Sequence, residues 1–353
     1  MILRAKLCIG LILGVGWFGV VGEGAEVTPL EAIHVGEIHT REAITAAKLV
    51  QSAESVQYEL TSRSGVRLWI DAEHGGLRRI VGRDGRRQYE WPGIRVVAHR
   101  GGVALGPPEN TLPAIAKAIE VGADLIEVDI RETADGTLVL MHDNTVDRTT
   151  DGRGLISELT ADAIARLRVR HGGDEVVRVP LLGEALRLMK GRIDADLDFK
   201  EGDFRKLIAA VKAAGMEDHV TMHSSWERCA EVMRLEPRIR IRPTVGHPEQ
   251  VRDLIAELKP AMINFDWHAV TEASVQAAHL GGCLAFVNCL EAADTDFYVK
   301  EAIRIGADYI QSDRPDRVVE ILRDLGMRVD SEPILGSSLG TPLRHPSLGY
   351  PLQ

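Results

Sequence analysis

The sequence has little cysteine, no excess of positive charge and, apart from one at the N-terminus, no long apolar run. It holds four cysteines in 353 residues, and none of their spacings matches a zinc site or a redox Cys-x-x-Cys pair. The formal net charge of −10 argues against general nucleic-acid binding and against a basic patch for anionic lipid. Any phosphate-bearing ligand would therefore need a local positive site made from a metal ion, arginine or lysine.

The apolar run at the N-terminus predicts export. Arg4 and Lys6 precede the run at 7–21, and the small residues Gly22 and Gly24 follow it. This order predicts a secretory signal peptide over residues 1–24 and a periplasmic or extracellular protein. The alternative is a membrane anchor over residues 7–21, although this run is short for a span.

Three cysteines lie beyond this segment, at positions 229, 283 and 289. An odd number leaves at least one free thiol in a monomer. We expect all three to be small buried side chains, although the spacing of Cys283 and Cys289 leaves a bridge between them open.

Residues 25–93 predict a small β-rich N-terminal extension. A helix is expected around 41–50, and four short alternating runs follow it, VQYEL, VRLWI, LRRIV and RQYEW. Glycine turns separate the runs at 64–65, 75–76 and 84–85. Three histidines of the extension lack a cluster of carboxylates or cysteines and are expected on the solvated surface: His34, His39 and His74.

Residues 94–328 alternate apolar strand-like runs with helix-sized stretches. The candidate strands are 94–98, 124–130, 137–142, 193–199, 219–223, 239–244, 261–265, 284–288 and 308–312, and helices are expected at 203–215, 248–258, 271–280 and 294–305. This alternation predicts an α/β fold, a (β/α)8 TIM barrel. Too few residues separate the second and third runs for a parallel crossover, so 137–142 is expected to fold back antiparallel.

Two segments do not fit the alternation. Residues 144–180 form an insertion after the early strands, and we expect it to cover the barrel mouth, with Thr160 capping a helix. Residues 329–353 include many Pro, Gly, Ser and Leu residues without periodicity, which predicts a flexible C-terminal tail.

Charged side chains gather at the ends of the early strands. Glu127 and Asp129 are two residues apart in LIEVDI, so they share one face of a strand. Two carboxylates side by side inside a fold repel each other unless a cation lies between them. A divalent metal held by oxygen ligands is the simplest explanation. His99, Arg100 and His142 end neighbouring runs and suit proton transfer and phosphate binding.

Taken together, these motifs resemble the glycerophosphodiester phosphodiesterase family. The matching stretches are HRGG (99–102), PENT (108–111), EVDIRETADGTLVLMHD (127–143), DRTTDGRG (147–154), LDFK (197–200) and QSDRPD (311–316). The combination of His-Arg-Gly, Glu-x-Asp and His-Asp in this order and spacing is highly specific, whereas no single piece of it would be.

The resemblance implies a metal-dependent hydrolase that cleaves glycerophosphodiesters into glycerol 3-phosphate and an alcohol. It makes His99 and His142 the general acid and base, and it gives Arg100 and Lys200 to the substrate phosphate. It assigns one divalent metal, Mg²⁺ or Ca²⁺, to Glu127, Asp129 and Asp198, with Asp196 as an alternative ligand. Which histidine acts first stays open, as does the nucleophile, which is either water or the glycerol 2-hydroxyl.

Two departures from the family affect these expectations. The third metal ligand is usually a glutamate in relatives, and the shorter Asp198 puts metal affinity or identity in doubt. Relatives commonly end a strand in a Trp-Thr-Val-Asn-like sequence, whereas this chain has AFVN at 285–288, which removes a large side chain expected to wall the pocket.

The alternatives follow from these departures. One is a phospholipase acting on lysophospholipids or another phosphodiester, with membrane contact through the lipid-like substrate or an uncleaved N-terminus. Another is a non-catalytic binding barrel, and a third pairs the carboxylates with arginine or lysine in place of metal.

Several further polar residues have modest interpretations. Asp143 is expected to hold a histidine or a turn. Glu109 is expected either to contact substrate or to bond to the first loop. The remaining histidines are expected at the surface or in polar parts of the core: His171, His219, His223, His247, His268 and His279.

Overall fold

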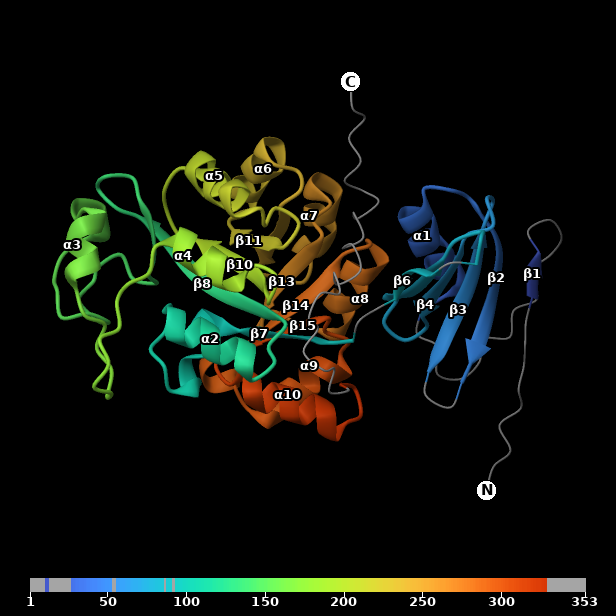
Figure 1. The fold of residues 1–353 in the computed structure, drawn as a ribbon. Helices are drawn as coiled ribbons and strands as arrows, with labels where there is room; N and C mark the ends of the chain where they lie inside the picture. Colours follow the sequence, from blue (N-terminus) through green and yellow to red (C-terminus); the bar gives the residue numbers. More distant parts are fainter. Residues whose placement is uncertain (1–9, 13–26, 53–54, 86, 91–92, 329–353) are drawn as a thin grey trace.

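The computed structural model describes residues 10–12, 27–52, 55–85, 87–90 and 93–328. The predicted tail at 329–353 lies outside the described residues, as does the predicted signal peptide except for 10–12. In Figure 1 the N-terminal sheet, the barrel and the insertion lie side by side from right to left, so the described part of the molecule is elongated.

The N-terminal sheet is antiparallel, with its strands in chain order. These strands are β1 (Gly10–Ile12), β2 (Ile44–Gln51), β3 (Val56–Ser62), β4 (Arg67–Asp71), β5 (Leu77–Val81) and β6 (Arg87–Glu90). Helix α1 (Pro29–Thr40) packs against β2, β3 and β4 and shares their apolar core. The four short strands predicted from sequence are confirmed. Gly65, Gly75 and Gly85 all have positive φ in the turns between them.

The helix predicted around residues 41–50 is wrong. Helix α1 begins earlier because Thr28 and Glu31 form a capping box, in which the Thr28 hydroxyl accepts from the Glu31 N–H and Glu31 accepts from the Thr28 N–H. It ends at Arg41, which has φ of 57°. The next residues then pair with β3 from Ile44 to Gln51. Pairing with an adjacent strand decides the structure of a segment whose own pattern is ambiguous.

Eight parallel strands form a closed barrel, which confirms the predicted (β/α)8 fold. They are β7 (Arg95–Ala98), β8 (Leu125–Glu132), β10 (Asp194–Phe199), β11 (Val220–Ser224), β12 (Arg240–Val245), β13 (Met262–Asp266), β14 (Leu284–Cys289) and β15 (Tyr309–Ser312). The ring closes because β10 pairs with β8 as well as with β11, while β15 pairs with β7.

Helices surround the barrel (Figure 1). They are α2 (Leu112–Glu120), α4 (Leu182–Met189), α5 (Phe204–Ala214), α6 (Trp226–Leu235), α7 (Gln250–Leu258), α8 (Glu272–Leu280), α9 (Asp296–Arg304) and α10 (Pro315–Asp324). None of the helices in the described ranges is long and apolar enough to cross a membrane.

Strand β9 (Leu138–Leu140) folds back on β8 in the antiparallel sense, as expected. The turn before it is made at Gly136, which has φ of 79°. The insertion that follows carries a short 3₁₀ helix, η3 (Ile156–Glu158), and helix α3 (Ala161–Arg166). Thr160 caps α3 by accepting from the Ala163 N–H at 3.3 Å. The insertion builds a small apolar core with β9, made of Val139, Met141, Val146, Ile156, Ile164, Val169, Val177 and Val179.

The N-terminal sheet covers the end of the barrel at which the strands begin. His279 at the end of α8 lies with Nδ1 2.8 Å from the His74 carbonyl oxygen and with Nε2 2.8 Å from Asp308 Oδ2. The His74 ring donates from Nε2 to the Arg304 carbonyl at 3.0 Å. His74 is therefore buried, and the prediction that it lies on the surface is wrong. Its two contacts with the barrel, to Arg304 and His279, are 230 and 205 residues away, so no local pattern reveals them.

The three cysteines of the described chain are free and buried, as expected for small core side chains. Burial raises the pKa of each thiol to about 12. The bridge between Cys283 and Cys289 that the sequence left open is not formed.

Candidate active site

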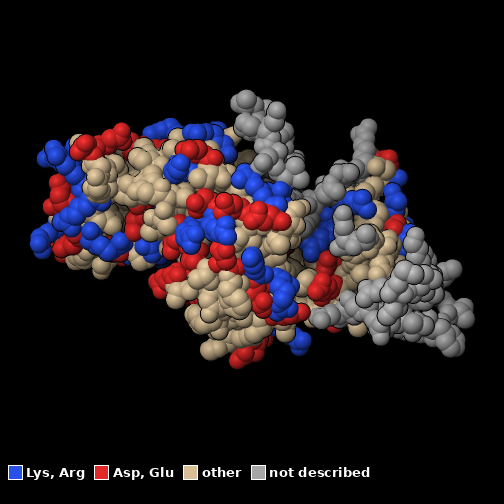
Figure 2. Space-filling view, turned by 90° about the horizontal axis from the view of Figure 1, so that it is seen from below, with Lys and Arg blue, Asp and Glu red and all other residues tan. Residues whose placement is uncertain are grey.

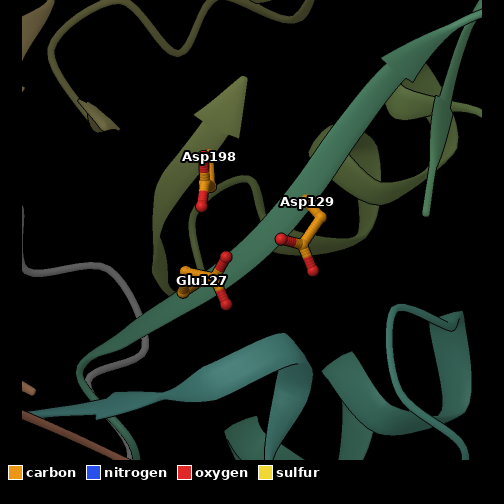
Figure 3. Close-up of side chains that lie close together, drawn as sticks. All are labelled: Glu127, Asp129 and Asp198. Carbon is orange, nitrogen blue, oxygen red and sulfur yellow. The ribbon is translucent and has the colours of Figure 1, made fainter. Parts of the chain in front are cut away.

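Three carboxylates meet at the C-terminal ends of two adjacent barrel strands. Glu127 and Asp129 lie on β8 and Asp198 lies on β10, with Asp198 in register with Asp129. One oxygen of each lies within 4.8 Å of the others. Figure 3 shows the three side chains turned toward one another from the two strands. This confirms that the two-residue spacing in LIEVDI places both carboxylates on the inner face.

Of the three carboxylates, Glu127 has the surroundings that most disfavour a negative charge. Its side chain is buried, and burial together with Asp129 and Asp198 raises its pKa well above the ordinary value. It accepts the backbone N–H of Arg100 at 2.8 Å. Arg100 has φ of 50°, and the following Gly101 has φ of 86° and packs so closely on α2 that a Cβ would lie 2.7 Å from the Ala114 Cβ. The left-handed backbone at Arg100 and Gly101 therefore fixes the direction of this N–H toward Glu127.

The other two carboxylates have cationic neighbours. Lys200 Nζ lies 2.9 Å from Asp129 Oδ1 and 2.5 Å from Asp198 Oδ2. Arg100 Nε lies 3.4 Å from Asp129 Oδ2. Burial alone would raise the pKa of Asp198, but His223 and Lys200 outweigh it and hold that pKa below its usual range. Burial would lower the pKa of Lys200, and the two aspartates instead raise it.

Asparagine 110 locks Asp129 in place from the first loop. Its side chain donates to Asp129 Oδ2 at 2.7 Å and accepts the Asp129 backbone N–H at 3.0 Å. Asn110 itself has φ of 56°, a conformation that asparagine tolerates better than most residues. The sequence shows Asn110 only as part of the PENT motif and does not indicate this role.

Asp196, the alternative metal ligand, is engaged elsewhere. It is fully buried, and its Oδ2 accepts from the Arg242 guanidinium at 2.6 Å. Burial raises the pKa of Asp196, and the arginine opposes that shift. Arg242 also lies 3.9 Å from the Phe286 ring centroid. Asp196 thus belongs to a closed ion pair below the three carboxylates and is not part of their group.

Both histidines that the sequence predicts to be catalytic form a hydrogen bond from Nδ1 to a carboxylate. His99 donates to Asp313 Oδ1 at 2.6 Å, and His142 donates to Asp143 Oδ1 at 2.8 Å. The other ring nitrogen of His99 lies 4.0 Å from Glu127 Oε2. Asp143 therefore holds a histidine, as expected. The sequence shows Asp313 only as part of the QSDRPD motif, and its position 214 residues after His99 gives no local signal of the pairing.

An arginine of the insertion links Glu109, in the loop before α2, to Asp143, which follows His142. Arg148 donates to both oxygens of Glu109 at 2.7 and 2.9 Å and to both oxygens of Asp143 at 2.7 and 3.0 Å. Glu109 also accepts from Arg100 at 3.1 Å, which supports its bond to the first loop. Burial would raise the pKa of Glu109, but the two arginines lower it. The sequence placed Arg148 in a matching motif without indicating this bridge.

The strand end AFVN does not open the pocket as expected. Phe286 and Asn288 are the inward residues of β14, since Phe286 stacks on Tyr309 and lies beside Arg242, while Asn288 donates to Asp266 at 2.7 Å. Because side chains alternate along a strand, Ala285 faces the opposite side. It is fully buried there, so its small size does not widen the mouth.

The three carboxylates fit a hard divalent cation. All donors are oxygens, and Glu127 and Asp129 are only 2% and 1% exposed. Within the described chain Glu127 forms no ion pair with lysine or arginine, and His99 at 4.0 Å is its nearest basic side chain. A cation with oxygen ligands, such as Mg²⁺ or Ca²⁺, would compensate this charge.

Surface charge does not supply an obvious alternative site. Figure 2 shows acidic and basic side chains interspersed on the face seen from below, with many basic ones over the insertion at the left. Exposed arginines of the insertion include Arg148, Arg153, Arg166, Arg168, Arg170 and Arg178. On this face no large patch of one sign is visible.

The sequence profile of the Glycerophosphoryl diester phosphodiesterase family matches residues 99–317. A glycerophosphodiester phosphodiesterase from Caldanaerobacter subterraneus subsp. tengcongensis is 34% identical over 160 residues, which are 41% of this chain. The match spans 64% of that relative's length, a little less than two thirds.

Solved structures agree with these matches. A glycerophosphodiester phosphodiesterase from Agrobacterium tumefaciens superposes with a TM-score of 0.56 at 29% identity, covering 63% of this chain and 98% of that one. An Oleispira antarctica phosphodiesterase, solved with its product sn-glycerol-3-phosphate, superposes with a TM-score of 0.57 at 22% identity, covering 65% and 97%. The second likeness is one of fold.

Proposed function

The chain belongs to the glycerophosphoryl diester phosphodiesterase family, and on this premise we propose that it is a metal-dependent hydrolase of glycerophosphodiesters that releases glycerol 3-phosphate and an alcohol. The observation that carries the proposal is the group of Glu127, Asp129 and Asp198 beside two histidines that are each oriented by a carboxylate. The names of the relatives and the product held by the Oleispira protein support the substrate class.

Glu127, Asp129 and Asp198 would hold one divalent cation, Mg²⁺ or Ca²⁺. When bound, such a cation supplies Lewis-acid stabilisation of the negative charge on the phosphoryl oxygens. The oxygen-only donor set favours these two cations over metals that prefer nitrogen or sulfur.

Arg100 and Lys200 would bind the non-bridging phosphate oxygens. Both already lie within 3.4 Å of the carboxylate group, so a phosphate docked against that group would come within their reach. Charge-assisted hydrogen bonds of this kind are stronger than neutral ones and neutralise the charge that builds up at the transition state.

His99 and His142 would carry the protons. Because Asp313 and Asp143 occupy Nδ1 of the two rings, each histidine keeps Nε2 to exchange a proton with substrate. One would take the proton of the nucleophile, and the other would protonate the departing alkoxide. The nucleophile is either water or the glycerol 2-hydroxyl, the second of which would pass through a cyclic phosphate.

The enzyme would act outside the cytoplasm, because residues 1–24 carry the pattern of a secretory signal peptide. This part of the proposal rests on sequence alone. Comparison of the N-terminal residue of the mature protein with that of the translated chain tests it.

The test is glycerol 3-phosphate release by the purified full-length chain. We would supply glycerophosphocholine or glycerophosphoethanolamine with Mg²⁺, Ca²⁺ or EDTA, and compare His99→Ala with His34→Ala. His34 is exposed on α1 in the N-terminal sheet, so its variant should keep the rate. Loss of a general acid or base costs about 10²–10⁴-fold, and we expect a loss of this size for His99→Ala.

Metal-independent release, or an unchanged rate for His99→Ala, would contradict the mechanism. A folded protein that is silent on both substrates with either metal, but active on lysophospholipids, would make the phospholipase alternative correct. A folded protein that is silent on all of them would favour a binding barrel.

A further inference from the structure

A chain of polar side chains crosses the barrel interior and ends on Asp198. His223 on β11 lies in register with Asp198, and its Nδ1 is 3.2 Å from Asp198 Oδ2. Its other ring nitrogen, Nε2, is 2.8 Å from the Thr244 hydroxyl on β12. Thr244 in turn accepts from the Asn264 side chain on β13 at 2.9 Å. Thr244 therefore holds the ring of His223 through Nε2, while Nδ1 is buried beside Asp198 Oδ2 at ion-pair distance and has no hydrogen-bond partner among the described residues.

Arg242 fixes the orientation of the Asn264 amide in this chain. An arginine can only donate, and Arg242 donates to Asn264 Oδ1. The amide nitrogen of Asn264 must then face Thr244, whose oxygen accepts it. The Thr244 proton is then free to donate to His223 Nε2, and in a ring that accepts there the proton lies on Nδ1. The opposite arrangement would point a bare nitrogen lone pair at the carboxylate of Asp198, which is repulsive.

We infer that His223 is a positioning residue for the metal site, because its buried Nδ1 faces Asp198 Oδ2 and leaves the second oxygen of Asp198 for the cation. This inference rests on the metal site of the proposed function. Lys200 donates to Asp198 Oδ2 at 2.5 Å, but it is shared with Asp129 and is needed for the substrate phosphate. His223 is the neighbour that stays when Lys200 turns to substrate. Its neighbours Thr244 and Asn264 fix it for that single contact.

Metal titration by calorimetry tests the inference, with MgCl₂ and CaCl₂ as separate probes and no substrate present. For His223→Leu we expect the Kd to rise by about 10-fold, the usual scale for losing a partner of a metal ligand. For His223→Asn we expect a Kd within about 3-fold of wild type, because the amide nitrogen occupies the position of Nδ1. Thr244→Val keeps the imidazole and loses only the group that orients its proton, so its Kd should lie between these values.

His219→Leu is the matched control. His219 Nδ1 lies 2.9 Å from Asp194 Oδ1, so it makes the same type of contact between the same two strand regions at the opposite end of the barrel. Its Kd should equal that of wild type. A kinetic readout separates positioning from general destabilisation: excess metal should restore the kcat of His223→Leu.

The outcomes separate the two proposals. If wild type binds metal and both His223→Leu and Thr244→Val bind it equally well, the positioning role is wrong and the proposed function stands. If His223→Leu is poorly folded, Thr244→Val alone decides in the same way. If wild type binds neither metal, the positioning role and the metal dependence both fail.

Discussion

Among single residues, Glu127 has the surroundings least suited to a charge, since it is buried beside two other carboxylates. We predict that Glu127→Gln stabilises the metal-free protein, because it removes a repelled charge and keeps the shape. The melting temperature should rise by roughly 2–4 °C, the shift that about 1 kcal/mol gives in domains of 150–250 residues. The same variant should lose the stabilisation that Mg²⁺ or Ca²⁺ gives to wild type. Thermal unfolding with EDTA and with metal measures both effects.

The stability gained by Glu127→Gln depends on pH, because the pKa of Glu127 is raised in the folded chain. The folded state thus binds the proton of Glu127 more tightly than the unfolded state. Its destabilising effect therefore grows as pH rises from about 4, the ordinary glutamate value, through the raised pKa. The gain of Glu127→Gln should be largest near pH 8 and vanish near pH 4. Glu120→Gln, at a mostly exposed position on α2, should show no such trend, and a gain independent of pH would contradict the account.

The sequence predicts the position and role of a side chain well when the partners of that side chain are close in the chain. The spacing of Glu127 and Asp129 placed both carboxylates correctly, and Thr160 capped its helix as expected. The sequence predicts the role of a side chain poorly when its partners come from other strands. His223 looked like an isolated histidine because Asp198 and Thr244 reach it only through the closure of the barrel.

At the scale of elements, the insertion is attached to the site by Arg148, which bonds both Glu109 and Asp143. We predict that Arg148→Ala lowers kcat by about 10-fold, equivalent to about 1.4 kcal/mol, because Asp143 loses the group that orients it toward His142. Arg148→Lys should recover only part of the rate, since one ammonium cannot form both bidentate pairs. Steady-state kinetics on glycerophosphocholine, with melting temperatures measured alongside, would show this.

Arg153→Ala is the control for that variant, because Arg153 lies in the same insertion and is exposed. Equal losses for the two alanine variants would mean that the insertion tolerates no change of charge. They would leave Arg148 without a specific role in holding Asp143.

The elements themselves were largely predictable, and the one wrong element shows why. All eight barrel strands and the antiparallel β9 follow from alternating apolar runs and turn residues. Residues 41–50 have a pattern compatible with either helix or strand, and long-range pairing with β3 makes the choice. Local propensity cannot supply that information.

At the scale of the whole molecule, the N-terminal sheet and the barrel meet through His74. Burial would lower the pKa of His74, but Asp71 raises it above the ordinary value. A raised folded-state pKa stabilises the folded protein below about pH 6.5, the ordinary histidine value, and this stabilisation is lost as pH rises through the raised pKa. We predict that wild type loses stability between pH 6 and 9 and that His74→Ala flattens this decline. Thermal unfolding across that range measures it.

Asp71, which lies beside His74, determines the pH below which this contact stops stabilising the folded protein. Burial would raise the pKa of Asp71, but His74 and Arg78 lower it, so its contribution is lost only as pH falls below about 3.9. His34→Ala is the control, since His34 is exposed on the same sheet domain. A decline in His74→Ala as steep as in wild type would show that this histidine does not govern the contact.

The N-terminal sheet lies at the end of the barrel where the strands begin (Figure 1), whereas Asp198 lies one residue before β10 ends and Asp129 lies beside it on β8. A bead, a fusion partner or a surface coupled to the chain ahead of the sheet would therefore hold the enzyme with its open end facing the bulk solution. Immobilisation from that side should leave turnover of small substrates close to its free value. Coupling through the exposed arginines of the insertion would bring the support to the end of the barrel where Arg148 bonds Glu109 and Asp143.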